Sequence, residues 1–513
     1  MAEETIINNK RIIKNTAFLY VRMFFIMAVT LYTSRVVLQV LGVEDFGIFN
    51  VVGGIVAMMG ILNGAMTSSV QRFLSFEIGT GDNMQLKRTF GISLIIYVIL
   101  CFAFVASAET IGLWFLNSQL NIPLDRMNAA NWVYQFTIVS VIVKLLGNPY
   151  NAAIIAHEDM NVFAYVSILE VLLNLIIVYL LLVITFDKLI VYGILYTASA
   201  ILITSCYYII CVKRYSECGF VFIKDKKLFN RILSYSGWNL FGSVAGVVKG
   251  QGLNVLLSMF FSPSVNAARG IAFQINTAVT QFFTNFYTAV RPQITMYYAQ
   301  GDIKNMLRLV FQSSKFSYYL ILLISLPIMI ETPTIIKIWL GQLPDYVVIF
   351  TRLIIVISAI DAMANPLMTT AHATGRIALY QSVVGTVIIM NIPISYVLLK
   401  LGYSPVSVFV VSLCISFICL FIRLWIVKRL VEFPIRKYLS GVFCPVLIVT
   451  VVSCSIPILL KTCINDSLDG IIIICIICVL STTLSVVFVG MTHNERTLIL
   501  KYINTKIKSK SVI

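Results

Sequence analysis

The chain has 513 residues, of which 59% are hydrophobic and only 12% are charged, and it carries a formal net charge of +16. Soluble globular domains carry about 25% charged residues, so this composition excludes a water-surrounded fold and indicates a protein embedded in lipid. The sequence has three histidines, no H-E-x-x-H motif and no glycine-rich phosphate loop. We therefore expect no metal, no cofactor and no enzyme activity.

About fourteen apolar segments are long enough to cross a bilayer as helices. Six precede a lysine-rich stretch at 213–231: 15–38, 46–77, 88–116, 131–156, 160–185 and 190–213. Eight follow it: 235–261, 266–299, 306–331, 346–372, 377–399, 404–428, 438–460 and 470–490. The first segment carries Arg22 and lacks a small-residue cleavage site, so we expect a retained span rather than a signal peptide.

Two parts of the chain repeat each other. Four residues recur in the same order 217 positions later: Asn148, Pro149, Asn174 and Tyr179 return as Asn365, Pro366, Asn391 and Tyr396. The pair Gly81-Asp82 likewise returns as Gly301-Asp302. The spacing predicts a duplicated unit of about six helices.

Basic residues are unevenly divided between the two sides of the predicted spans. If both termini are cytoplasmic, 24 of the 38 lysines and arginines fall in cytoplasmic segments and five fall on the opposite side. This bias predicts an even number of spans and that orientation. It also places most of the positive charge at the membrane surface, so we expect no nucleic-acid partner.

Nine basic residues remain inside predicted spans, where a charge costs at least about 2.5–3.5 kcal/mol. They are Arg22, Arg35, Arg72, Lys144, Lys249, Arg269, Arg291, Arg352 and Arg423. Those near span ends can reach the headgroups: Arg72, Arg291 and Arg423 on the cytoplasmic side, and Arg35, Arg269 and Arg352 on the other. Arg22, Lys144 and Lys249 lie deeper, and Lys249 stands among glycines in the sequence GVVKGQG.

Glu170 and Asp361 are the clear mid-span carboxylates. They either pair with a buried cation, for example Asp361 with Arg352, or couple transport to a proton or cation. Because deep cations outnumber deep anions, a cavity lined by these residues would favour an anionic ligand such as a phosphate or diphosphate. Pro149 and Pro366 remove a helical hydrogen bond at equivalent places, so they are either hinges or packing kinks.

Two stretches resemble the bacterial polysaccharide (O-antigen) flippases. They are KNTAFLYVRMFFIMAVTLYTSRVVLQVLGVEDFGIFNVVGGI near the start and SPSVNAARGIAFQINTAVTQFFTNFYTAVRPQITMYYAQGD in the second half. That superfamily also contains the MATE drug exporters and the lipid II flippase. The resemblance implies an all-α integral membrane protein of the bacterial inner membrane. It further implies about fourteen transmembrane helices, with two pseudo-symmetric six-helix lobes around a V-shaped cavity and two added helices.

On this resemblance we expect an N-terminal lobe at 1–215 and a basic cytoplasmic linker at 216–233. A C-terminal lobe at 234–430 then precedes two further helices and a basic tail at 431–513. The implied activity is alternating-access transfer of a polyprenyl-pyrophosphate-linked oligosaccharide from the cytoplasmic to the periplasmic leaflet. The implied partners are this cargo, membrane lipid and other polysaccharide-assembly proteins.

Cavity arginines and lysines of such flippases are thought to meet the pyrophosphate, and the matching positions are Arg22, Lys249 and Arg269. Lys144, Arg35 and Arg291 complete our predicted binding set, and Glu170 and Asp361 are candidate coupling groups. Unlike typical MATE exporters, the first span has no acidic residue, which puts cation coupling in doubt. The alternatives are a cation-coupled drug exporter, a lipid II flippase and a membrane enzyme, the last disfavoured by loops too short to form a domain.

Overall fold

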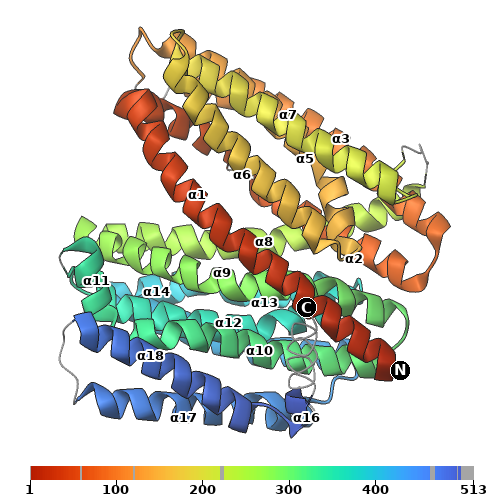
Figure 1. Ribbon diagram of the computed structural model, residues 1–513, viewed down its shortest axis with the longest axis vertical. Coiled ribbons are helices and arrows are strands. Elements are labelled where there is room, and N and C mark those ends of the chain that lie inside the picture. The colour runs from red at the N-terminus through yellow and green to blue at the C-terminus, as the bar shows by residue number, and fades with distance from the viewer. Residues whose placement is uncertain are drawn as a thin grey trace, which may run out of the picture. The chain divides into compact units, whose positions relative to one another are not determined.

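The computed structural model describes residues 2–57, 60–118, 122–219, 225–341, 343–462, 468–493 and 495–497. This part of the chain is almost entirely helical and contains no strand (Figure 1). The first half forms α1 (Ala2–Ala57), α2 (Gly60–Thr80), α3 (Asn83–Ser107), η1 (Ala108–Gly112), α4 (Leu113–Ser118), α5 (Met127–Ala156), α6 (Met160–Val183) and α7 (Lys188–Arg214). The segments labelled η are π-helical.

The second half continues with helices of similar length. It forms α8 (Lys226–Phe260), α9 (Pro263–Ala299), α10 (Ile303–Ile330), α11 (Thr332–Leu340), α12 (Val347–Ala373), α13 (Ala378–Ile389), α14 (Asn391–Lys400) and α15 (Val406–Val431). The last elements are α16 (Ile435–Tyr438), η2 (Leu439–Phe443), α17 (Cys444–Lys461), α18 (Leu468–Ser485) and η3 (Val486–Gly490).

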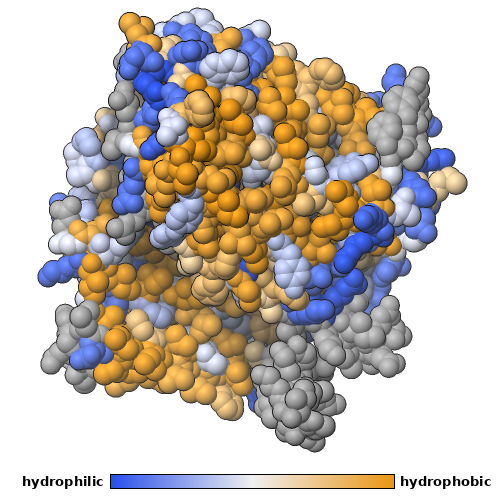
Figure 2. Space-filling model, turned by 45° about the horizontal axis from the view of Figure 1, so that its top comes forward, coloured by the Kyte–Doolittle hydropathy of each residue, from blue (hydrophilic) through white to orange (hydrophobic). Residues whose placement is uncertain are grey.

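Eleven helical stretches among the described residues are long and apolar enough to cross a membrane. The other long helices are α1, α2 and α9, which coincide with the first, second and eighth predicted spans. Hydrophobic side chains cover broad areas of the face shown in Figure 2, as expected for a surface that meets lipid. The structure therefore confirms an all-helical, multi-pass architecture, and its helix count agrees roughly with the predicted fourteen.

Glycines mark the ends of helices where the sequence predicts breaks. Gly42 has φ 79° and ψ 170° and interrupts α1 between the first two predicted spans. The repeated Gly-Asp pairs make the same turn: Gly81 and Gly301 have φ 76° and 74°. The aspartate that follows each glycine accepts backbone hydrogen bonds at the start of the next helix. The sequence repeat thus corresponds to a repeated local structure.

Packing divides the chain into two compact units. Unit 1 comprises Met1–Val244, Thr288–Asn305 and His372–Ser382, so it holds the first-half helices together with the ends of several second-half helices. In unit 1, α5 packs along α7 and α1 packs along α6. Its core is aromatic and aliphatic, with fully buried Phe73, Phe90, Tyr97 and Tyr134.

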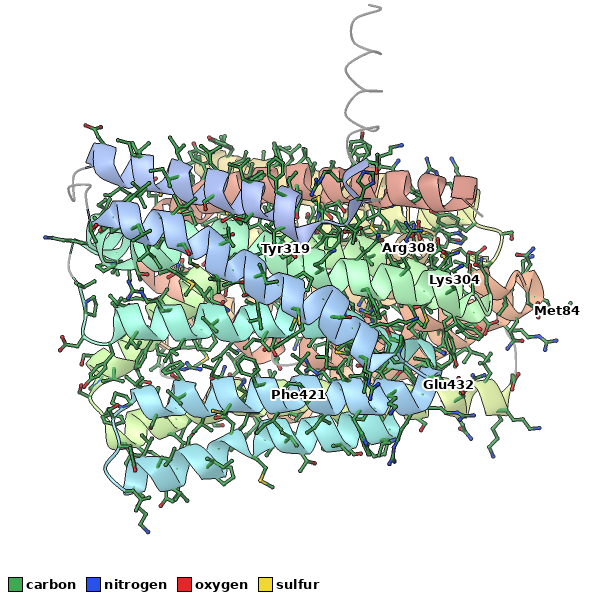
Figure 3. All side chains as sticks on the ribbon, turned by 90° about the horizontal axis from the view of Figure 1, so that it is seen from below. Met84, Lys304, Arg308, Tyr319, Phe421 and Glu432 are labelled. Atoms are coloured by element: carbon green, nitrogen blue, oxygen red, sulfur yellow. The ribbon has the colours of Figure 1, made fainter. Side chains whose placement is uncertain are left out.

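Unit 2 comprises Ala245–Tyr287, Met306–Ala371 and Val383–Ile513. Within it, α17 packs along α18 and α14 packs along α15. Lys304 and Arg308 mark the start of α10, and Tyr319 lies farther along the same helix, next to Gly490 (Figure 3). The lobe and linker boundaries expected from the sequence remain a prediction, and linker residues 220–224 and tail residues 498–513 lie outside the described part.

A charged cluster joins three elements of unit 1 at the predicted outer side. Arg126, before α5, donates to Asp45 of α1 at 2.8 Å and to Asp187, before α7, at 2.7 Å. Burial would raise the pKa of Asp187, but hydrogen bonds from Arg126 and from the start of α7 outweigh it and lower that pKa. Arg126 thus favours the ionised form of the Asp187 carboxylate while also bonding to Asp45.

Replacing Arg126 by glutamine should lower the free energy of unfolding by about 1 kcal/mol near neutral pH. A lowered carboxylate pKa contributes stability above the unfolded-state value and loses it as the pH falls through the folded-state value. The difference between variant and wild type should therefore shrink as the pH falls below the ordinary aspartate pKa of about 3.9. Unfolding in detergent at several pH values measures it, with Lys188→Gln as the neighbouring control. A difference that grows in acid would contradict the assignment.

Candidate functional site

A charged cluster lies among α1, α5, α6 and α7 in unit 1. The Lys144 ammonium donates to a Glu170 carboxylate oxygen at 3.3 Å and to the Tyr196 hydroxyl at 3.2 Å. It also lies 4.8 Å from the centre of the Tyr196 ring. Lys144 and Glu170 are each about one-third exposed, so the pair is accessible rather than sealed in the core.

Arg22 belongs to this same cluster but makes no ion pair or hydrogen bond with any described residue. Its guanidinium lies 4.4 Å from the centre of the Phe163 ring, and its Nε is buried without a hydrogen-bond partner. The charge of Glu170 acts on it from a distance, and Glu170 is already bonded to Lys144. We call Arg22, Lys144 and Glu170 the first charged cluster; it has one positive charge in excess.

A second charged cluster lies in unit 2 and consists of Lys249, Asp361 and Arg423. An Arg423 guanidinium nitrogen lies 4.0 Å from an Asp361 oxygen, and the Arg423 side chain is largely buried. The charges of all three residues act on the Cys419 thiol, so Lys249 lies near the Arg423–Asp361 pair. This cluster also has one positive charge in excess.

Lys249 has no hydrogen-bond or ion-pair partner in the described part of the chain, and its side chain is half-buried. One of the glycines near it allows close approach: a Cβ at Gly252 would come within 2.5 Å of the Ile392 side chain on α14, whereas a Cβ at Gly246 or Gly250 would meet nothing within 4 Å. The Gly250 carbonyl accepts a hydrogen bond from Arg269. Gly252 therefore packs α8 closely against α14, while the lysine ammonium stays without a partner among the described residues.

The ion pairs of the two clusters occupy matching places in the sequence repeat. Lys144 and Asp361 each lie one helical turn before an Asn-Pro pair, at positions 217 apart. Cation and anion are exchanged, because the first half carries the lysine at this position and the second half carries the aspartate. Each half therefore has an ion pair, but the two pairs are not copies of each other.

The uncommitted cations also occupy similar places. The repeat residue Tyr179 meets Tyr32 of α1 with 2.6 Å between the hydroxyls, and its counterpart Tyr396 contacts Phe260 of α8 with 5.7 Å between the ring centres. Arg22 precedes Tyr32 by ten residues, and Lys249 precedes Phe260 by eleven. Each half thus carries one cation at nearly the same position along its first helix, counted from the aromatic residue that contacts the repeated tyrosine.

The other predicted binding residues are occupied or lie outside the described side chains. Arg269 donates to the Gly250 carbonyl at 2.7 Å and to Asn254 at 3.1 Å, and its guanidinium lies 4.4 Å from the Phe273 ring centre. Arg291 donates to the Ser68 carbonyl at 3.1 Å. The backbone of Arg35 is part of α1, but its side chain lies outside the described ones.

Several sequence-based expectations about charges were wrong. Arg72 does not extend to the headgroups but is buried, and it donates to the carbonyls of His372 and Ala373. His372 is buried as well. Asp361 pairs with Arg423 rather than Arg352.

Two further basic side chains have partners that sequence spacing did not reveal. Arg352 donates to the Met329 carbonyl at 2.9 Å. Lys315 is buried in α10 and bonds to Glu495. These partners lie on other helices, so only the packing of the helices reveals them.

Both candidate hinge prolines lie inside continuous helices, Pro149 in α5 and Pro366 in α12. Asn148 accompanies the first and hydrogen-bonds to Asn63 of α2. Next to the second, the Asn365 carbonyl accepts a hydrogen bond from Tyr287 of α9 at 3.1 Å. These neighbours supply polar contacts at both sites, and a role for either proline as a hinge remains a prediction.

The comparisons with known proteins identify the fold. No family model matches the chain, and no curated protein matches its sequence. Among solved structures, an outward-facing multidrug resistance transporter of the MATE family in the MOP superfamily has TM-score 0.71 and 13% identity, over 83% of this chain and 96% of that one. A Vibrio cholerae MATE transporter in its bent form has TM-score 0.66 and 15% identity, over 85% of this chain and 99% of that one.

A MOP superfamily transporter from Pyrococcus furiosus is also similar, with TM-score 0.66 and 13% identity over 82% of this chain and 96% of that one. At these identities the likeness establishes the fold alone. The chain is therefore an all-α multi-pass membrane protein with the MATE transporter fold, which confirms the predicted fold class. The narrower resemblance to polysaccharide flippases remains a prediction.

Proposed function

We propose that this protein is a flippase for polyprenyl-diphosphate-linked oligosaccharide. By alternating access it moves the lipid from the cytoplasmic to the periplasmic leaflet of a bacterial inner membrane. Arg22 and Lys249 are each proposed to bind the diphosphate. Lys144 and Arg269 are proposed to make the electrostatic potential near these cations more positive. A phosphate group would satisfy either Arg22 or Lys249, each of which has no ion-pair or hydrogen-bond partner among the described residues.

One observation carries the proposal. Of the nine basic residues in predicted spans, eight have described side chains, and six of those eight bond to a carboxylate or a backbone carbonyl. Arg22 and Lys249 are the two that do not. A charge in a span costs several kcal/mol unless it is paired or serves a ligand, so two uncommitted cations favour an anionic cargo.

The carboxylates support the same conclusion. Export of a cationic drug, or coupling to a cation, needs an acidic group that is free to bind it. Glu170 and Asp361 are already engaged by Lys144 and Arg423. Pocket charge can differ within this fold: the Pyrococcus furiosus transporter is described as having a binding pocket of reverse polarity that suggests a different function.

The test uses purified protein in vesicles loaded with a fluorescent polyprenyl diphosphate that carries an oligosaccharide. Arg22→Gln and Lys249→Gln should each slow transfer about 10- to 100-fold, and the double variant should abolish it, because each cation supplies one or more charge-assisted hydrogen bonds. Lys213→Gln removes an exposed charge at the end of α7 and should transfer at the wild-type rate.

Wild-type transfer rates in the double variant would remove Arg22 and Lys249 from the mechanism. Efflux of a cationic dye that depends on Glu170 or Asp361 would support a drug exporter instead. Transfer of lipid II in preference to other diphosphate lipids would favour the lipid II flippase. The three outcomes use different probes, so one preparation distinguishes them.

A further inference from the structure

The exposed face of α9 differs from that of its neighbour α8 in unit 2. Between Arg269 and the end of this unit's part of α9, the exposed residues are Gly270, Phe273, Gln274, Thr277, Ala278 and Gln281. They recur every three or four positions and so form one stripe along the helix. On α8, the exposed residues of this unit are mostly apolar: Gly246, Val247, Val248, Val255 and Met259, with Gln251 and Ser258 as the polar members.

The opposite side of α9 is apolar and packed. Ala268, Ala272, Val279 and Phe283 are buried in the hydrophobic core of unit 2. The helix is therefore fixed with its polar stripe outward. A membrane helix that buries its apolar side and exposes amides does not match hydrocarbon, because unsatisfied polar groups in lipid cost free energy. The stripe must face water or a polar ligand.

The stripe is polar but carries no charge. Residues 270–290 contain no acidic residue, lysine, arginine or histidine, and the flanking arginines at 269 and 291 are about 33 Å apart along the helix, close to the thickness of a bilayer's hydrocarbon core. The side-chain amides of Gln274 and Gln281 hydrogen-bond to no residue in the described part of the chain. The Thr277 hydroxyl donates only to its own helix, at the Phe273 carbonyl.

We propose that this face of α9 binds the sugar portion of the transported lipid. The inference rests on the proposed function and deepens it by assigning a separate part of the cargo. A neutral, polyhydroxylated ligand suits the stripe, because amides both donate to and accept from hydroxyl groups. The exposed ring of Phe273 adds an apolar surface for the C–H face of a sugar ring. A hydrocarbon chain would leave the amides unpaired, and the Arg269 guanidinium beside Phe273 is already hydrogen-bonded to the Gly250 carbonyl and to Asn254.

Water access can be measured first. Gln274→Cys, Thr277→Cys and Gln281→Cys should react with a membrane-impermeant maleimide above the wild-type background, in intact vesicles of the full-length protein. Val255→Cys and Met259→Cys on α8 are the matched controls and should not react. Equal labelling of both sets, or of neither, would overturn the inference.

Binding measurements then distinguish recognition of the sugar from recognition of the diphosphate. Gln274→Leu with Gln281→Leu should weaken binding of the oligosaccharide-linked polyprenyl diphosphate about 30-fold, since two hydrogen-bonding amides are lost. Binding of the sugar-free polyprenyl diphosphate should stay unchanged. Gln300→Leu, just beyond the end of α9 and exposed, controls for the substitution itself.

The two proposals fail in different ways. If the wild type binds neither lipid, the proposed function is wrong. If the wild type binds both lipids and the double glutamine variant binds the sugar-bearing one equally well, the assignment of α9 is wrong while the flippase proposal stands. If the variant loses both lipids equally, the stripe does not recognise sugar specifically, which also overturns the assignment.

Discussion

Replacing Lys315 by methionine is expected to lower the free energy of unfolding by about 3–5 kcal/mol, because it leaves the partner carboxylate buried without its countercharge. The Lys315 ammonium lies 2.7 Å from a Glu495 oxygen, and the two side chains are only 4% and 8% exposed. Glu495 also accepts a hydrogen bond from the Thr492 backbone at 2.8 Å. The pair therefore ties the segment after α18 to the middle of α10.

The companion change separates the loss of an ion pair from a loss of packing. With Glu495 replaced by leucine as well, both charges disappear, and most of the lost stability should return because the cost of burying a charge disappears with them. Lys304→Met, exposed at the start of the same helix, should stay within about 0.5 kcal/mol of wild type. Unfolding monitored in detergent measures all of these variants. A double variant no more stable than Lys315→Met would mean that the segment is held by other contacts.

The sequence was sufficient for the fold class because the signals for helices in lipid are local. Span lengths follow from apolar runs, and the break at Gly42 and the turns at Gly81 and Gly301 follow from residues that permit a positive φ. The repeat of Asn148-Pro149 also predicted which positions correspond between the halves. Each of these inferences needs only the order of residues along the chain.

Partners across helices could not be predicted in the same way. The sequence placed Asp361 and Arg352 in one span, and spacing alone suggested that they pair. The structure instead brings Arg423 of α15 to Asp361 and gives Arg352 a backbone carbonyl. The packing of whole helix faces decides which helices are neighbours. The spacing of residues within one helix does not predict these neighbours.

The same limit explains which cations remain candidates for the site. Sequence depth selected Arg22, Lys144 and Lys249, and the structure distinguishes among them because Lys144 has Glu170 and Tyr196 as partners. The sequence did not mark Tyr196 as a partner of Lys144, because aromatic residues are common in membrane spans. The polar stripe of α9 did leave a signal, the three- and four-residue spacing of Gln274, Thr277 and Gln281, but it emerges only when the exposed side of the helix is known.

Replacing Arg72 by methionine is expected to lower the free energy of unfolding by about 3 kcal/mol. Arg72 of α2 donates from Nε to the His372 carbonyl at 3.0 Å and from a second nitrogen to the Ala373 carbonyl, so it caps the C-terminal end of α12 within unit 1. The rings of Phe73 and Phe76 lie 4.8 and 4.9 Å from the guanidinium. Methionine fills the space but leaves both carbonyls without this donor.

The variant Arg72→Lys tests whether the stabilisation by Arg72 depends on its charge or on the geometry of its hydrogen bonds. A lysine keeps the positive charge but cannot reproduce the planar fork that reaches two successive carbonyls, so it should recover less than half of the lost stability. Arg88→Met removes an exposed arginine from the adjacent α3 and should leave stability within about 0.5 kcal/mol of wild type. Full recovery with lysine would show that charge alone suffices and that the cap geometry does not matter.

The position of Arg72 gives this substitution a functional consequence as well. It joins a helix of the first half to the end of a helix of the second half, and both lie in unit 1. Under the proposed alternating access, contacts between the two halves at one side of the membrane must break in each cycle. A variant that weakens this contact should therefore change the rate of lipid transfer without changing the affinity for a sugar-free polyprenyl diphosphate, which we propose to depend on Arg22 and Lys249. Loss of that affinity in Arg72→Lys would instead place Arg72 in the binding site.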